Sequence, residues 1–231
     1  MFPASQFLEG TFLLIDKPIK WTSHDVVNKV RYHLSRYCKV KKLKVGHAGT
    51  LDPLATGLLI LATGKFTKQL DSIITQDKEY SGSFFLGGTT ASFDAETEVN
   101  SNYLTAHITS ELIHETAKQF VGIIMQFPPA HSAVKVQGKP LYVHARKGIE
   151  VEVAARPIEI SSFEITGIEM PLVHFKVNCS KGTYIRTLAN DFGKALNSGA
   201  YLSNLCRTRI GDYFLVDALS LESFLQSLKV D

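Results

Sequence analysis

Asp52 is a carboxylate in an apolar setting, which makes it a candidate catalytic group. It lies between Leu51 and Pro53 in a loop bounded by glycines, and an apolar segment follows directly. An apolar site favours the neutral carboxylic acid, which is not nucleophilic, unless a cation lies close by. An Asp before Pro is also a common turn residue. On its position alone, Asp52 is therefore either a catalytic group or part of a turn.

Arg186 and Tyr80 are the two residues that could assist a catalytic carboxylate. The spacing of apolar residues predicts a helix over 185–196, with Arg186 in its first turn, where the helix dipole disfavours a cation. A negative partner is therefore expected, although a surface arginine is the alternative. Tyr80 begins an alternating pattern that predicts a strand over 80–86. It offers a ring for stacking, or it is simply a core tyrosine.

Other kinds of catalytic site are not indicated. No two of the eight histidines are spaced four apart beside a carboxylate, so no metal site is predicted. Gly57 to Lys65 has the glycines of a phosphate-binding loop at the wrong spacing, and Phe66 replaces the required Ser or Thr. The three cysteines are far apart, which fits neither a zinc site nor a disulfide framework. We therefore expect no metal-dependent catalysis.

Basic residues are concentrated near the start of the chain. Residues 1–50 hold nine Lys and Arg against three acids, although the net charge of the whole chain is only +3. Residues 26–51 contain no acid and seven basic residues: Lys29, Arg31, Arg36, Lys39, Lys41, Lys42 and Lys44. Such a run is typical of a surface that contacts phosphates, and a solvated helix face is the alternative.

The elements that must position these groups alternate irregularly between strands and helices. A capping box at Thr22 to Asp25 precedes a predicted helix whose apolar residues recur every three or four positions up to Tyr37. We expect a loop over 39–50, a buried strand over 58–62, helices over 65–74 and 110–121, and a strand over 173–179. Thr183 is expected to cap the helix at 185–196. This order favours an α+β fold with a largely antiparallel sheet.

Length and composition set the broad class. A chain of 231 residues with 45% apolar and 20% charged residues is ordinary globular protein and can form a single domain over 1–231. Its apolar runs are far shorter than the roughly 20 residues needed to cross a bilayer. The first ten residues lack the features of a signal peptide. Together with the cysteine usage, this predicts a cytoplasmic protein.

One long motif and four shorter ones resemble a known enzyme family. Residues 46–59 read GHAGTLDPLATGLL, and matching stretches occur at 16–23, 77–80, 128–148 and 181–188. Together they resemble the TruB family of tRNA pseudouridine synthases along nearly the whole chain. This resemblance implies the pseudouridine synthase fold and the tRNA pseudouridine-55 synthase reaction, in which the T-loop uridine of tRNA is isomerised without a cofactor.

The resemblance also implies roles for individual residues. Asp52 would be the nucleophile, Tyr80 would stack on the target base, and Arg186 would be the partner of Asp52. The residues expected to contact substrate or RNA are His47, Lys17, Pro18, Tyr184, Leu205, Lys41, Lys42, Lys44, Lys135 and Arg146. A flipped uridine loses its stacking, and an aromatic ring can return about 1–3 kcal/mol per base. An ionised carboxylate can stabilise or attack the ribose carbon, as in retaining glycosidases, or it can add to the uracil ring.

Three departures from the family pattern have expected consequences. Lys20 replaces a usual Gly and changes the expected turn geometry, although its charge would suit RNA, and Ser92 and Thr97 replace a usual Thr and Gly, which suggests an altered hairpin. We also expect a short form without the C-terminal PUA domain and hence weaker binding of tRNA. The 126–148 segment would be an inserted thumb that grips RNA, or merely a variable loop. The expected partner is the T arm of tRNA, bound by a monomer without an obligate protein partner. A non-catalytic RNA-binding protein and an enzyme acting on another RNA are the rival functions.

Overall fold

The computed structural model describes residues 3–130, 132, 134–136, 138–145, 149, 151 and 153–228, and it divides into two compact units. The first unit comprises the described residues up to Tyr80 together with those from Leu205 onward, and the second comprises Ser81–Asn204. Strands β4 (Lys78–Leu86) and β12 (Ala200–Ile210) each run from one unit into the other. The single domain expected from the sequence stays a prediction.

The first unit contains four α-helices and five further strands among the described residues. Its helices are α1 (Ala4–Glu9), α2 (Ser23–Tyr37), α3 (Leu70–Ile74) and α7 (Leu221–Ser227), with 3₁₀ turns η1 (Gly64–Gln69) and η2 (Leu215–Asp217). Its strands are β1 (Phe12–Lys17), β2 (Val45–His47), β3 (Thr56–Thr63), β13 (Tyr213–Phe214) and β14 (Leu219–Ser220). They pair in the order β14-β1-β3-β12, with β2 on β3 and β13 on β12.

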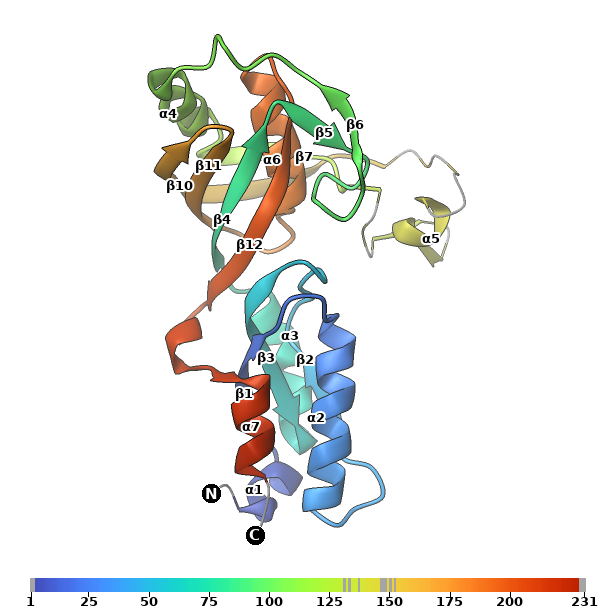
Figure 1. Ribbon diagram of the computed structural model, residues 1–231. Helices are drawn as coiled ribbons and strands as arrows, with labels where there is room; N and C mark the ends of the chain where they lie inside the picture. Colours follow the sequence, from blue (N-terminus) through green and yellow to red (C-terminus); the bar gives the residue numbers. More distant parts are fainter. Residues whose placement is uncertain are drawn as a thin grey trace. The chain divides into compact units, whose positions relative to one another are not determined.

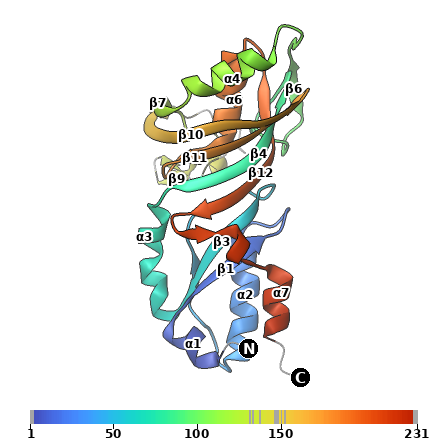
Figure 2. The ribbon, with the colours of Figure 1, turned by 90° about the vertical axis from the view of Figure 1, so that its left-hand side faces the viewer.

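Strand β3 is the centre of the first unit because both of its faces are buried. Leu59 and Leu61 point into a core formed with α1, α2 and α7, whereas Leu58 and Ile60 point into a second core with α3. Figure 2 shows the corresponding layers, with α2 and α7 on one side of β1 and β3 and α3 on the other. A strand buried on both faces needs a continuous apolar run, which is why 58–62 contains no polar residue.

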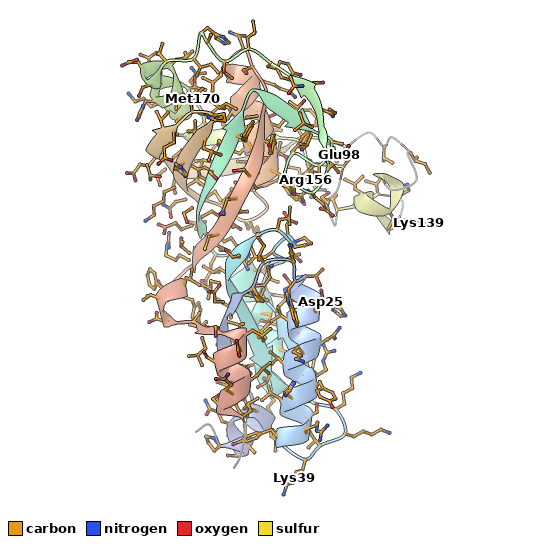
Figure 3. The ribbon with its side chains drawn as sticks, viewed as in Figure 1. Asp25, Lys39, Glu98, Lys139, Arg156 and Met170 are labelled. Carbon is orange, nitrogen blue, oxygen red and sulfur yellow. The ribbon has the colours of Figure 1, made fainter. Side chains whose placement is uncertain are left out.

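Helix α2 begins at the predicted capping box. The Thr22 hydroxyl accepts a hydrogen bond from the Asp25 amide, and the Asp25 carboxylate accepts one from the Thr22 amide at 3.0 Å. Val26, Val27, Val30 and Leu34 face the core. In Figure 3, Asp25 is labelled in the first turn of this helix, and Lys39 is labelled just beyond its last residue, Tyr37.

The second unit is a sheet with two packed helices. The main sheet runs in the order β12-β4-β11-β10-β7, where β7 is Gly122–Gln126, β10 is Arg156–Glu169 and β11 is Leu172–Cys179. Two further strand pairs are separate from it. One consists of β5 (Gly88–Thr90) and β6 (Val99–Asn102), and the other of β8 (Lys135–Val136) and β9 (Lys139–Pro140). Helix α4 (Ser110–Gln119) packs on β10 and on α6 (Ile185–Ala195), and α5 (Leu141–Ala145) follows β9 (Figure 1). Phe84, Phe163, Phe175 and Phe192 pack together at its core.

The α+β fold with a largely antiparallel sheet is confirmed, and three local predictions need correction. The expected loop over 39–50 contains strand β2, because the edge of β3 offers it backbone partners. The helix expected over 65–74 is split into η1 and α3. Thr183 does not cap α6: its hydroxyl donates to the Ser180 carbonyl at 2.9 Å, and Tyr184 occupies the cap position.

None of the helices in the described part of the chain is long and apolar enough to cross a membrane.

Candidate active site

Asp52 lies in a tight turn that leads into β3. The Ala55 amide donates to the Asp52 carbonyl at 3.1 Å, and the Lys20 amide donates to the Pro53 carbonyl at 2.8 Å. The Asp52 side chain is half-buried. The turn predicted for an Asp before Pro is therefore present, and it is anchored to a second loop at Lys20, so the turn and catalytic interpretations of Asp52 are compatible.

Ser23 fixes the residue before Asp52. Its buried hydroxyl accepts from the Leu51 amide at 2.9 Å and lies 3.2 Å from the Leu51 carbonyl, to which it donates. Ser23 is the first residue of α2, so the first turn of this helix holds the loop backbone directly. The sequence analysis assigned Ser23 to the capping box and missed this second contact, for which the residue type gives no specific signal.

Arg207 holds the same loop from strand β12. Its side chain is only 1% exposed, its Nε donates to the Leu58 carbonyl at 2.8 Å, and Nη2 donates to the Gly49 carbonyl at 3.1 Å. Gly57 allows this close approach, because a Cβ at that position would lie 2.4 Å from the Arg207 carbonyl oxygen. Sequence reasoning missed Arg207. The sequence offered one indication of its role, which is that Arg207 lies two residues after Leu205, a predicted pocket residue.

Lys17 is a second buried cation beside the loop. Its ammonium is fully buried and donates to the carbonyls of Pro18 at 3.0 Å, Trp21 at 2.7 Å and Pro53 at 3.4 Å. Burial lowers the pKa of Lys17 to about 8, and the negative charge of Asp52 partly opposes this shift. Lys17 is therefore not a solvated turn lysine: it binds three backbone carbonyls and shares an electrostatic environment with Asp52.

His47 follows the basic run and ends strand β2. Burial lowers the pKa of its imidazole below the usual value, a backbone contact with Gly49 opposes the shift, and Arg207 adds to it. The ring is therefore neutral at physiological pH. Its Nδ1 atom is buried and makes no hydrogen bond within the described residues. A neutral imidazole with an unused nitrogen can donate to or accept from a nucleobase edge.

Three other predicted residues belong to the same unit. Tyr80 is 8% exposed on strand β4, and Leu205 is also buried, with its carbonyl accepting from the Thr56 hydroxyl at 3.4 Å. Pro18 is half-buried, and its carbonyl accepts from Lys17. The burial of Tyr80 agrees with the core-residue alternative, and its stacking role stays a prediction.

Arg186 lies in the second unit, where it pairs with Asp94. The Arg186 Nε atom is 3.7 Å from an Asp94 carboxylate oxygen, and both side chains are buried. The Arg186 guanidinium also donates to the Ser92 carbonyl at 3.4 Å. A negative partner was expected for a cation in the first turn of a helix, and Asp94 is such a partner. The pairing of Arg186 with Asp52 stays a prediction.

Ser92 and Thr97, which depart from the family pattern, hold Asp94. The Ser92 hydroxyl donates to the Asp94 carboxylate at 2.6 Å and lies 2.8 Å from the Thr97 hydroxyl. The Glu96 amide donates to the same carboxylate oxygen at 3.0 Å. The substituted residues therefore form a closed hydrogen-bonded turn around Asp94, which the sequence analysis described only as an altered hairpin.

Tyr184 is fixed by its backbone at the start of α6. Its amide donates to Gln126 Oε1 at 2.8 Å, and the Gln126 amide group donates to the Tyr184 carbonyl at 3.1 Å. This buried glutamine links the end of β7 to the start of α6. The phenol ring of Tyr184 is half-buried.

The predicted basic contacts fall into two groups. Lys41, Lys42 and Lys44 are exposed in the loop between α2 and β2. Lys135 lies in the short strand β8, but its side chain lies outside the described residues, as does the whole of Arg146. The basic segment is thus accessible in the first unit, and the RNA-binding role of the thumb stays a prediction.

The predicted site residues divide between the two units. Asp52, Lys17, His47, Tyr80 and Leu205 belong to the first unit. Arg186 and Tyr184 belong to the second. The first unit offers a half-buried carboxylate in a loop that is anchored by buried cations, which suits an attack on an electrophilic carbon in surroundings of low polarity.

Comparisons with known proteins identify the family. Residues 36–185 match the model of the TruB family pseudouridylate synthase N-terminal domain. A tRNA pseudouridine synthase B of Flavobacterium johnsoniae is 54% identical over 97% of this chain and 98% of its own length. One of Phocaeicola vulgatus is 54% identical over 94% of this chain and 93% of its own.

Solved structures agree with this assignment. A crystal structure of a Cbf5-Nop10-Gar1 complex matches with a TM-score of 0.73 and 28% identity, over 97% of this chain and 56% of that one. An archaeal box H/ACA Nop10-Cbf5 complex matches with a TM-score of 0.70 and 25% identity, over 98% and 56%. These proteins share the pseudouridine synthase fold. The chain belongs to the TruB family of pseudouridylate synthases and is an isomerase that modifies RNA.

Proposed function

We propose that this enzyme converts the T-loop uridine 55 of tRNA to pseudouridine, with Asp52 as the nucleophile, a flipped target base and no cofactor. The observation that carries the proposal is the construction of the 46–59 loop, in which Ser23, Lys17 and Arg207 bind the backbone on both sides of Asp52. The names of its relatives, which are tRNA pseudouridine synthases B, support tRNA as the substrate.

The reaction needs a single carboxylate because the leaving group is also the group that returns. The bond between C1′ and N1 of the uridine breaks, the uracil turns, and a bond forms between C1′ and C5. One proton leaves C5 and one binds N1, so the reaction is balanced without an oxidant or reductant. Asp52 either attacks C1′ or adds to the uracil ring, and both routes require an ionised carboxylate.

Neighbouring groups of the first unit support the ionised form and the extruded base. The ammonium of Lys17 lies within the electrostatic reach of Asp52. The apolar side chains of Leu51 and Leu205 are buried beside the loop and would help to exclude water. In the proposal, Tyr80 stacks on the base, and the unused Nδ1 of His47 contacts the base or a T-loop neighbour.

Other residues would act on the rest of the tRNA. Arg186 is proposed to be the partner of Asp52, and Tyr184 and Pro18 to line the pocket. Lys41, Lys42 and Lys44 would contact phosphates, because they are exposed on a segment without acids. Lys135 and Arg146 would contact RNA from the thumb.

The direct test is to incubate the protein with an unmodified tRNA transcript without added metal. New pseudouridine is then mapped by reverse transcription after carbodiimide treatment. We expect one new stop at position 55 and no stop in a transcript that carries cytidine there. A stop elsewhere in the tRNA would overturn the T-loop assignment, and the absence of any stop would overturn tRNA as the substrate.

A further inference from the structure

A hollow of about 540 Å³ lies along the outer face of α2, away from the buried face of that helix. It is lined by Lys20, Trp21, Asp25, Asn28, Lys29 and Tyr32. Its volume falls in the range of about 300–1,000 Å³ that is usual for small-molecule sites. The hollow is open to solvent, and none of its lining residues belongs to the proposed catalytic group.

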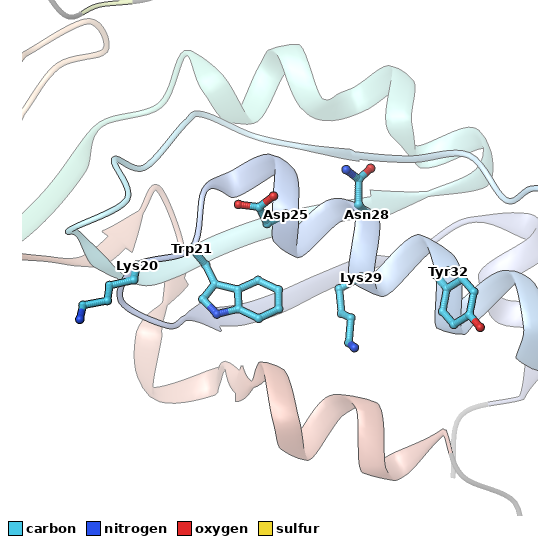
Figure 4. A pocket seen from close by; sticks show the side chains of 6 residues that line it. All are labelled: Lys20, Trp21, Asp25, Asn28, Lys29 and Tyr32. Atoms are coloured by element: carbon cyan, nitrogen blue, oxygen red, sulfur yellow. The ribbon is translucent and has the colours of Figure 1, made fainter.

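The lining combines aromatic rings with cations. Figure 4 shows Trp21, Lys29 and Tyr32 projecting to the same side of α2, whereas Asp25 and Asn28 project to the other. Lys20 stands at one end of the row. An aromatic ring beside a lysine suits a nucleotide, since the base stacks on the ring and the phosphate binds the ammonium.

The aromatic walls are held in place by polar contacts. The Arg36 guanidinium donates to the Tyr32 hydroxyl at 2.7 Å and lies 5.6 Å from the centre of the Tyr32 ring. Trp21 packs partly against the core, and its carbonyl accepts from Lys17. Both rings are therefore oriented before a ligand arrives, which lowers the entropic cost of binding.

Asp25, the acid in the lining, accepts hydrogen bonds at the start of the helix. The Asp25 carboxylate accepts hydrogen bonds from the Thr22 amide and from its hydroxyl, at 3.0 and 2.6 Å. Asn28 accepts from Arg31 through its carbonyl oxygen at 2.9 Å, so its amide hydrogens face outward as donors. The side of the hollow that carries Trp21 and Lys29 therefore offers rings and positive charge without a carboxylate.

The hollow is physically joined to the Asp52 loop. The Lys17 ammonium binds the Trp21 carbonyl and the Pro53 carbonyl together, and the Lys20 amide binds the Pro53 carbonyl. A ligand held on Trp21 is thus positioned relative to Asp52 by a single buried cation. A strand of RNA that leaves the catalytic loop could follow this path along α2.

We propose that this hollow is a second RNA subsite, which binds nucleotides other than the target uridine, with bases stacked on Trp21 and Tyr32 and a phosphate at Lys29. The inference rests on the proposed function, because it takes tRNA as the ligand. The subsite would add affinity outside the catalytic loop and help to fix the register of the RNA.

The protein contains a built-in reporter of this subsite, because Trp21 is its only tryptophan. The probe is an unmodified tRNA transcript with cytidine at the target position, which binds without turnover. Binding is followed by the anisotropy of end-labelled tRNA and, in parallel, by Trp21 emission. We expect the emission to be quenched with the same midpoint as the anisotropy change, since a stacked base quenches indole fluorescence.

Two substitutions of exposed residues test the contacts. Tyr32→Ala should weaken tRNA binding by about fivefold or more, as expected for a lost stacking wall. Lys29→Ala should weaken it and lower the slope of log affinity against log salt by about one. The controls are Tyr32→Phe, which keeps the ring, and Lys118→Ala, which removes an exposed helical lysine of α4; both should bind within about twofold of the wild type.

The outcomes separate this inference from the proposed function. If the wild type forms pseudouridine in tRNA and binds it without a change in Trp21 emission, the subsite is overturned and the function stands. The subsite is also overturned, and the function again stands, if Tyr32→Ala and Lys29→Ala both bind tRNA like the controls, even when Trp21 emission is quenched. If the protein neither binds nor modifies tRNA, both proposals fail.

Discussion

The two units of the molecule hold their buried cations in different ways. In the first unit, Lys17 and Arg207 donate to backbone carbonyls of the loops around Asp52. In the second, Arg186 pairs with a carboxylate, Asp94. Carbonyls carry no net charge, so the first arrangement fixes the position of a loop without using an acid. Backbone groups of the Asp52 loop are therefore held by donors from other parts of the chain, which suits a loop that carries a catalytic group.

The largest effect should follow from removing Arg207. Arg207→Met removes the buried charged donor from the carbonyls of Gly49 and Leu58, which should lower the free energy of unfolding by about 4 kcal/mol. Urea unfolding measures the loss. Arg209→Met, on the same strand but half-exposed, should cost about 1 kcal/mol. Equal losses for the two variants would show that Arg207 has no special structural role.

A smaller effect is expected in the second unit from Asp94→Asn. This change removes the negative charge that lies 3.7 Å from the buried Arg186 guanidinium and should cost about 3 kcal/mol, near the lower end for a broken buried pair. Hydrogen exchange should then rise first in Ser81–Asn204, whereas Arg207→Met should raise it first in the other unit. Glu98→Gln, which changes an exposed acid nearby, is the control. The same exchange pattern for both variants would contradict the contrast between the units.

Several elements could be predicted because local sequence decides them. The capping box at Thr22 and the spacing of valines in α2 identify that helix, and the unbroken apolar run over 58–62 identifies a strand buried on both faces. The long motif around Asp52 identified the family. In these cases the residues that determine the structure are neighbours in sequence.

The parts that could not be predicted depend on contacts between distant residues. Arg207 binds Gly49 and Leu58, which are 158 and 149 positions away, so the residues beside it in the sequence do not identify these partners. Asp94 and Arg186 are likewise far apart in the chain. Strand β2 forms because β3 offers a free edge, and its own residues lie in a polar, glycine-containing segment. Burial of Lys17 was missed because a lysine before proline usually faces solvent.

The smallest predicted effect is a dependence of the unfolding free energy on pH, which arises in the first unit. Burial lowers the pKa of Lys17 to about 8 from 10.5, so between these values the folded protein has lost a proton that the unfolded chain still holds. Stability therefore rises with pH in this window, by about 1.5 kcal/mol from pH 8 to about pH 9.5.

The measurement is the difference in unfolding free energy between the wild type and Lys17→Met, taken across that pH range. The wild type should gain on the variant as the pH rises. Lys65→Met, which removes an exposed lysine of the same unit, accounts for solvated lysines. A wild-type advantage that stays constant with pH would mean that Lys17 keeps its ordinary pKa.

The central claim is that Asp52 carries out the chemistry while other residues hold its loop. The measurement that tests it most directly is single-turnover pseudouridine formation by Asp52→Asn, with tRNA affinity and thermal unfolding measured on the same sample. We predict a loss of rate of roughly a thousandfold or more, with affinity and unfolding close to wild type and to the Asp71→Asn control. A rate within about tenfold of wild type would contradict the claim.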